Sequence, residues 1–178
     1  MSEPEFSIVI RFDAIGRMQW PAHVEADAPA RERLAARFGF AALEKLEADY
    51  SLTRDGSTLV ASGTIHARLA QPCIATGKPV AETVNEAFAI RFVPEGSLAS
   101  PDSADEIELD AEECDTLPYS GERIDIGEAI AETLALAVNP YPRSPNADTY
   151  LREAGVLTEE QASPFAALAA LKEKGAKK

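Results

Sequence analysis

The chain is poor in the residues from which catalytic and metal sites are usually built. Its 178 residues include two cysteines, Cys73 and Cys114, and two histidines, His23 and His66. Two cysteines make no disulfide framework, and a zinc site of three or four close ligands would have to draw on these four residues. Neither a phosphate-binding loop nor a dinucleotide-binding glycine pattern occurs. We therefore expect no metal, no cofactor and no enzymatic activity.

Long apolar runs are missing as well. No stretch approaches the 18 apolar residues that would indicate a membrane-spanning helix. The opening residues, MSEPEF, lack the basic and then apolar pattern of a secretory signal. The hydrophobic fraction of 46% is still enough for a core, in one domain with extensions or in two very small domains. These features predict a cytoplasmic protein without a membrane partner.

Basic residues are in the minority. Seventeen Lys and Arg stand against 30 Asp and Glu, a net charge of -13. Because proteins that track phosphates use clustered Lys and Arg, this balance argues against non-specific nucleic-acid binding and favours a basic protein partner. Nine of the acidic residues lie in 95–115, which contains no Lys or Arg. We expect a linker or loop there, either a simple solvated segment or a phosphate mimic for a basic protein.

Alternating segments are the strongest structural signal that is present. Residues 57–70 and 80–93 alternate apolar and polar side chains around a turn at Gln71–Pro79, as half-buried antiparallel strands do. Leu46–Thr53 alternates too and is joined to the first segment by Asp55-Gly56, a pair that favours a type I′ hairpin turn. We expect Leu43–Val93 to form a three-stranded meander, with a strand at Phe6–Asp13 on one of its edges.

Helices are expected on either side of this meander. Asp27 and Gly39 suit the start and stop of a helix over Ala28–Phe38. Asp125, followed by Glu128, suits the start of another that ends before Asn139-Pro140. The fold class is therefore α+β, an antiparallel meander, possibly a partial barrel, with two or three packing helices. We expect one α+β domain over 1–142 with an acidic loop at 95–115, and an extension over 143–178 that is loosely structured before a short amphipathic helix from Pro164.

Three groups of residues resemble the YceD-like family, the large ribosomal RNA subunit accumulation proteins. They are the strand-turn-strand segment 63–93 with Cys73, Thr76 and Pro79-Val80, the segment Ile124-Asp125-Ile126 through Asn139-Pro140, and the terminal residues 164–168. The resemblance implies a cytoplasmic, non-enzymatic factor that supports accumulation of large-subunit ribosomal RNA. Many members carry a second cysteine three positions after the first. Thr76 stands there in this chain, which removes a ligand from any metal site shared with those members.

Three hypotheses of function follow. The favoured one is an accessory factor of ribosome biogenesis that binds a basic ribosomal protein or a pre-ribosomal particle through its acidic surface. The alternative is a direct RNA-binding module with a basic patch of Arg68, Lys78 and Arg91 near the Cys73 turn. The third, an enzyme using His66 and a carboxylate, has the least support. The expected partner-binding residues are the following: Arg68, Cys73, Thr76, Lys78, Arg91, Phe165 and Leu168.

Overall fold

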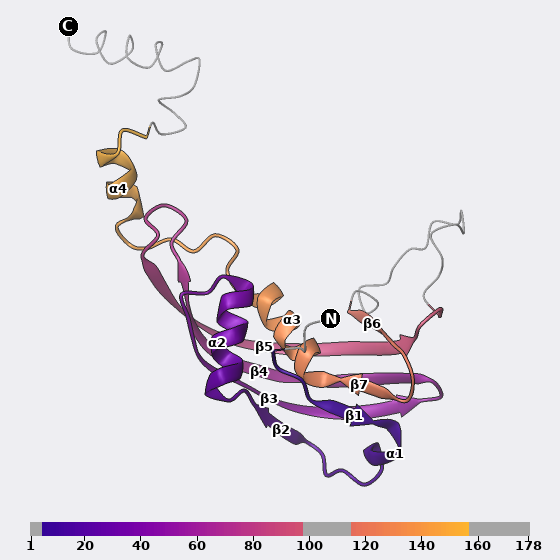
Figure 1. The fold of residues 1–178 in the computed structure, drawn as a ribbon. Coiled ribbons are helices and arrows are strands. Elements are labelled where there is room, and N and C mark those ends of the chain that lie inside the picture. The colour runs from indigo at the N-terminus through magenta and orange to yellow at the C-terminus, as the bar shows by residue number, and fades with distance from the viewer. Residues whose placement is uncertain (1–4, 98–114, 157–178) are drawn as a thin grey trace, which may run out of the picture.

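A five-stranded sheet with the order β2-β3-β4-β5-β6 dominates the computed structural model, which describes residues 5–97 and 115–156 (Figure 1). A second sheet pairs β1 with β7. The α+β class is thus confirmed, and the large sheet does not close into a barrel. The elements of the described residues are β1 (Val9–Arg11), α1 (Phe12–Ile15), β2 (Ala22–Glu25), α2 (Ala28–Phe38), β3 (Ala42–Asp55), β4 (Thr58–Pro72), β5 (Pro79–Pro94), β6 (Thr116–Tyr119), β7 (Arg123–Asp125), α3 (Ile126–Ala137) and α4 (Ala147–Glu153).

The expected three-stranded meander is confirmed in β3, β4 and β5, which pair antiparallel in sequence order. The first turn differs in type. Asp55 pairs with Thr58, so the connecting residues are Gly56 and Ser57, and among the described residues only glycines have positive φ. A positive φ at the first connecting residue alone (Gly56, 60°) is the pattern of a type II′ turn, so the type I′ prediction is wrong.

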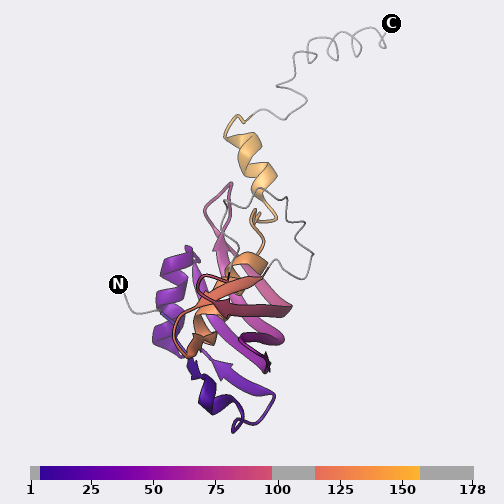
Figure 2. The same ribbon diagram turned by 90° about the vertical axis from the view of Figure 1, so that its right-hand side faces the viewer.

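The inner face of the meander forms the core. The apolar residues expected to share this face are buried from all three strands, among them Tyr50, Ile65 and Phe88. The helices α2 and α3 and the β1–β7 pair lie over the same face of the sheet (Figures 1 and 2). The other face of β2–β5 carries mostly polar side chains and no helix from the described part of the chain.

Three expectations about the edges of the sheet and the tail are corrected. The N-terminal strand is shorter than Phe6–Asp13 and pairs with β7, not with the meander. The edge partner of β3 is β2, in a stretch where no strand was predicted. The last strand, β6, runs parallel to β5, and α4 forms within a segment expected to be loose.

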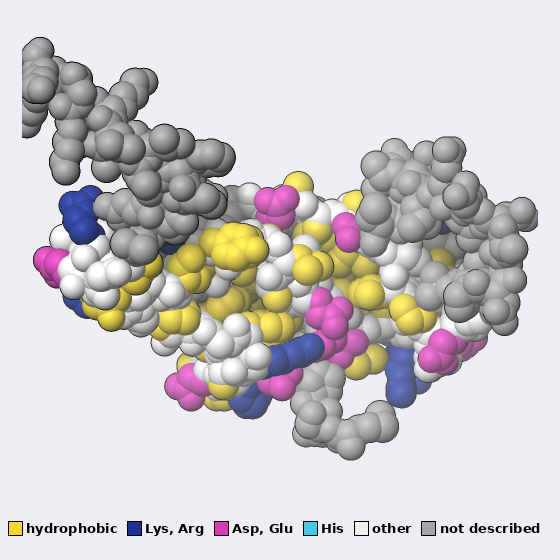
Figure 3. Space-filling view, turned by 90° about the horizontal axis from the view of Figure 1, so that it is seen from above, with side chains coloured by type: hydrophobic (Ala, Val, Ile, Leu, Met, Phe, Trp, Pro, Cys, Tyr) yellow, Lys and Arg dark blue, Asp and Glu magenta, His cyan; other side chains and the backbone are white. Residues whose placement is uncertain are grey.

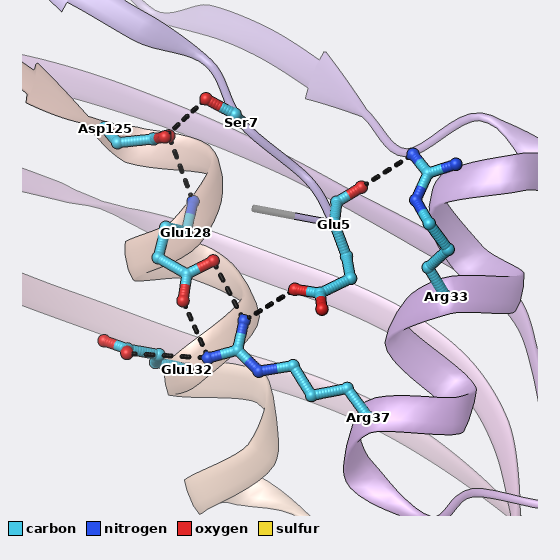
Figure 4. A network of polar contacts seen from close by, with 7 residues as sticks. All are labelled: Glu5, Ser7, Arg33, Arg37, Asp125, Glu128 and Glu132. Carbon is cyan, nitrogen blue, oxygen red and sulfur yellow. Dashed lines mark hydrogen bonds and ion pairs between the residues drawn. The ribbon is translucent and has the colours of Figure 1, made fainter. Parts of the chain in front are cut away.

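Polar contacts explain where the N-terminal segment goes. The Asp125 carboxylate accepts from the backbone N–H of Glu128 at 3.2 Å (Figure 4). It also accepts from the backbone N–H of Ile8 at 2.8 Å, so one side chain both caps α3 and holds the segment before β1. The capping role of Asp125 is confirmed. The Glu128 carboxylate, however, contacts Arg37 of α2 at 2.7 Å.

Arg37 links three parts of the chain. Its guanidinium also contacts Glu5 at 3.0 Å and Glu132 at 3.9 Å (Figure 4). The hydrogen bond to Glu128 is the main cause that raises the pKa of Arg37 above its usual value. The helix α2 is itself confirmed as expected, capped by Asp27 and closed by Gly39 with φ of 71°. Within the described ranges, no helix is both long and apolar enough to cross a membrane.

Candidate functional site at the Cys73 turn

The connection between β4 and β5 is a closed turn of residues 73–78. The N–H of Cys73 donates to the carbonyl of Lys78, and the N–H of Gly77 donates to the carbonyl of Cys73, both at 2.8 Å. Gly77 has φ of 68°, a conformation that favours glycine. The sequence Thr76-Gly77-Lys78 therefore serves to close a turn.

The segment that follows α3 binds this turn. Ile74 N–H donates to the carbonyl of Pro142 at 2.9 Å. Ser144 donates to the Cys73 sulfur from its N–H (3.2 Å) and its hydroxyl (3.4 Å), and the Thr76 hydroxyl lies 3.4 Å from that of Ser144. Cys73 and Thr76 are therefore brought together, and Ser144 of the tail contacts both of them.

A second set of contacts joins the base of the turn to the end of α3. The buried Gln71 amide donates to Glu82 (2.8 Å) and to the carbonyl of Asn139 (2.9 Å). Glu82 accepts the N–H of Asn139 through its other oxygen (2.9 Å). These roles of Ser144, Gln71 and Glu82 were not predicted from the sequence. The one related signal in the sequence was Asn139-Pro140. It predicted the end of the helix but not that the chain after this helix would bind the base of the turn.

The environment of Cys73 favours its thiolate. The Ser144 hydroxyl, and then that of Thr76, lower the pKa of the Cys73 thiol to about 6. The side chain is 3% exposed. Because its sulfur is enclosed by these donors, we assign it a structural role in joining the turn to the tail. The exposed side chains of the tip are those of Ile74 and Lys78, and the exposed side chain of Tyr141 lies on the tail.

The two arginines of the expected patch lie apart. Arg68 stands opposite Thr83 in the β4–β5 ladder, whereas Arg91 stands opposite Val60, eight residues further along β5. At about 3.3 Å per residue this separation is about 26 Å. The structure therefore does not gather Arg68, Lys78 and Arg91 into one patch around the turn. Phe165 and Leu168 lie outside the described residues.

Arg91 instead lines a shallow groove between β5 and the second half of α3. It shares this groove of about 740 Å³ with Phe88, Asp115 and the exposed Leu136 of α3. Seen from above the molecule, hydrophobic side chains gather on the described surface, with Asp and Glu side chains around them (Figure 3). Apolar surface and carboxylates thus occur together on this side.

The uncovered face of the sheet is polar but not aromatic. The aromatic side chains of β3, β4 and β5 are Tyr50, Phe88 and Phe92, and all three are buried in the core. Sheets that bind single-stranded RNA present aromatic rings on which bases stack. These three strands offer no such platform, which weakens the case for RNA binding on this face.

Comparison with known protein families gives a match over more than half of the chain. The family model described as "Large ribosomal RNA subunit accumulation protein YceD" matches residues 61–172. This range includes β4 from residue 61 onward, the Cys73 turn, α3 and the tail that binds the turn, and it also includes Phe165 and Leu168. No curated protein and no solved structure matches the chain.

Proposed function

The chain belongs to the YceD family of large ribosomal RNA subunit accumulation proteins, and on that premise we propose that it binds a basic ribosomal protein, or the basic part of a pre-ribosomal particle, through its acidic surface. Membership of the family implies a role in the accumulation of large-subunit ribosomal RNA. The family has no known catalytic activity. The partner and the way it is bound are our proposal.

The distribution of charge carries this proposal. The chain holds 30 acidic and 17 basic residues, and nine of the acidic residues lie in 95–115. Both ends of that stretch are fixed to the sheet: Glu95 N–H donates to the carbonyl of Tyr119, and Arg91 N–H donates to the carbonyl of Asp115. Opposite charge speeds encounter and selects partners. A cationic protein surface is therefore the partner that this chain attracts most strongly.

Affinity capture with the tagged full-length chain tests the proposal. We expect large-subunit ribosomal proteins to be captured at about 0.1 M salt and released near 1 M, because the screening length falls from about 10 to about 3 Å. One variant changes four carboxylates of the acidic stretch to amides, namely Asp102, Asp105, Glu106 and Glu108. A matched control makes the same change at four exposed carboxylates elsewhere, namely Glu32, Glu44, Glu122 and Glu153. Capture should fall in the first variant and persist in the control. Capture that survives 1 M salt, or that is equal in the two variants, would contradict the electrostatic mechanism.

We place a second contact at the tip of the β4–β5 hairpin. Buried Cys73 and half-buried Thr76 shape this tip, and Ile74, which is 57% exposed, is its outward apolar residue. Replacing Ile74→Ser should weaken capture of the particle without lowering stability. Val9→Ser removes an equally exposed apolar group (54%) far from the tip and should leave capture unchanged. Equal capture by both variants would remove the tip from the binding surface.

A further inference from the structure

Both histidines of the chain lie on the uncovered face of the sheet, and one of them forms a compact cluster with two carboxylates. His23 and Glu25 come from β2 and Glu47 from β3. One ligand atom from each, a ring nitrogen and two carboxylate oxygens, lies within 4.8 Å of the others. We propose that these three residues form a site for a divalent first-row transition metal ion, with zinc as the representative ion.

The strand register explains why the three side chains meet. Glu25 stands directly opposite Glu47 in the antiparallel β2–β3 ladder. His23 precedes Glu25 by two residues and therefore points to the same face. Two carboxylates directly opposite each other repel, which destabilises the pair unless a cation lies near them. The Lys45 ammonium, 2.7 Å from Glu47, offsets part of that repulsion, and a metal ion bound between the carboxylates would offset more of it.

His23 is already held in the way that metal-bound histidines usually are. Its Nδ1 lies 3.0 Å from the carboxylate of Asp49, the residue opposite it on β3. Because an ionised carboxylate only accepts hydrogen bonds, Nδ1 carries a proton when this bond is made, and Nε2 keeps a free lone pair. A carboxylate that orients a ligating imidazole is a recurrent feature of zinc sites. Asp49 is thus the positioning residue of the cluster.

Glu47 is suited to binding a cation. The Lys45 ammonium donates a hydrogen bond to the Glu47 carboxylate at 2.7 Å, which orients this carboxylate beside the cluster. Lys45 contacts one carboxylate oxygen, and the second oxygen is available to a metal. His66 stands opposite Glu47 on β4, with its Nδ1 2.7 Å from Asn85. This second imidazole is the next donor along the same row.

The chemistry of the set indicates the class of ion. One imidazole and two carboxylates match the nitrogen and oxygen ligands of zinc sites that keep a fourth position open. His23 and Glu25 are exposed and Glu47 is half-buried, so an ion could enter from solvent. The cluster is also separate from Cys73, which lies in the turn after β4, seven residues beyond the His66 that stands opposite Glu47.

Calorimetric titration of the full-length chain with zinc chloride tests the proposal. The variants are His23→Ala and Glu47→Gln, and the matched control is Glu86→Gln, an exposed carboxylate of β5 outside the cluster. Every protein keeps both cysteines, so zinc bound by thiols is common to all. We expect one zinc ion to be lost, or bound at least about tenfold more weakly, in the two cluster variants only. In backbone NMR spectra, zinc should shift the amides of residues 22–25 and 47–49. The proposal is overturned if His23→Ala binds zinc with the stoichiometry and affinity of the parent chain, or if the shifts gather at Cys73 alone.

Discussion

Replacing Glu82→Ala should release the tail from the hairpin and lower the free energy of unfolding. Glu82 accepts two hydrogen bonds, from the Gln71 amide at 2.8 Å and from the Asn139 N–H at 2.9 Å. Hydrogen bonds to a charged group contribute about 1.5–3 kcal/mol each when they are shielded from water. The Gln71 bond is shielded because Gln71 is buried, whereas Asn139 is exposed and can bond to water instead. We therefore expect a loss of about 2–3 kcal/mol rather than twice that amount.

Urea unfolding measures the global effect, and hydrogen exchange measures the local one. The N–H of Ile74, which donates to the carbonyl of Pro142, should exchange faster in the variant because the tail no longer covers it. Glu82→Gln keeps one acceptor oxygen and should lose less stability than the alanine variant. Glu86→Ala, an exposed change on the same strand, should stay within about 0.5 kcal/mol of the parent. If Glu82→Ala also stays within that range and the Ile74 amide keeps its protection, the tail is not held by this network and the reasoning fails.

Three further changes probe the sheet, the turn and the helix α3. Gly63→Ala should cost about 2–3 kcal/mol in urea unfolding, because a Cβ there would lie 2.1 Å from the carbonyl oxygen of Asp49; an unchanged midpoint would contradict the close approach of β3 and β4. The stability difference between the parent and Cys73→Ala should grow from pH 6 to pH 9. In the folded protein the pKa of this thiol is lowered to about 6, so its contribution to the free energy of unfolding is complete above the ordinary thiol pKa near 9 and is lost as the pH falls through 6. A stability difference that is constant with pH would refute the thiolate assignment. Asp125→Ala should cost about 1–2 kcal/mol in thermal unfolding through the lost cap of α3, and no loss would mean that Ile8 and the helix are held by other contacts.

Local signals in the sequence predicted most of the sheet and both longer helices. Alternation placed the buried residues of β4 and β5, and the caps at Asp27 and Asp125 placed the helix starts. These features depend on neighbouring residues in the chain, which is why they can be read from it. The predicted turn type was wrong because Asp-Gly is compatible with two registers of the hairpin. The pairing of β3 with β4 selects the register in which Gly56 is the first of the two connecting residues.

Long-range contacts account for the features that could not be predicted. The pairing of β1 with β7 depends on Asp125 holding Ile8, residues that are 117 positions apart. In the same way, the Cys73 turn was recognised as a special segment, but its partner Ser144 lies 71 positions away. The expected basic patch around the turn did not form for a related reason. Arg91 would lie near the turn only if β5 were short, but β5 is 16 residues long and Arg91 lies in its second half.

The most direct test of the central claim is to map which residues touch the partner. Carboxylate-to-lysine cross-linking of the full-length chain under gentle lysis, followed by mass spectrometry, identifies both the partner and the contact. We predict cross-links from the acidic stretch, including its anchored ends Glu95 and Asp115, to lysines of large-subunit ribosomal proteins. Cross-links confined to other parts of the surface, or the absence of any large-subunit component, would contradict the account.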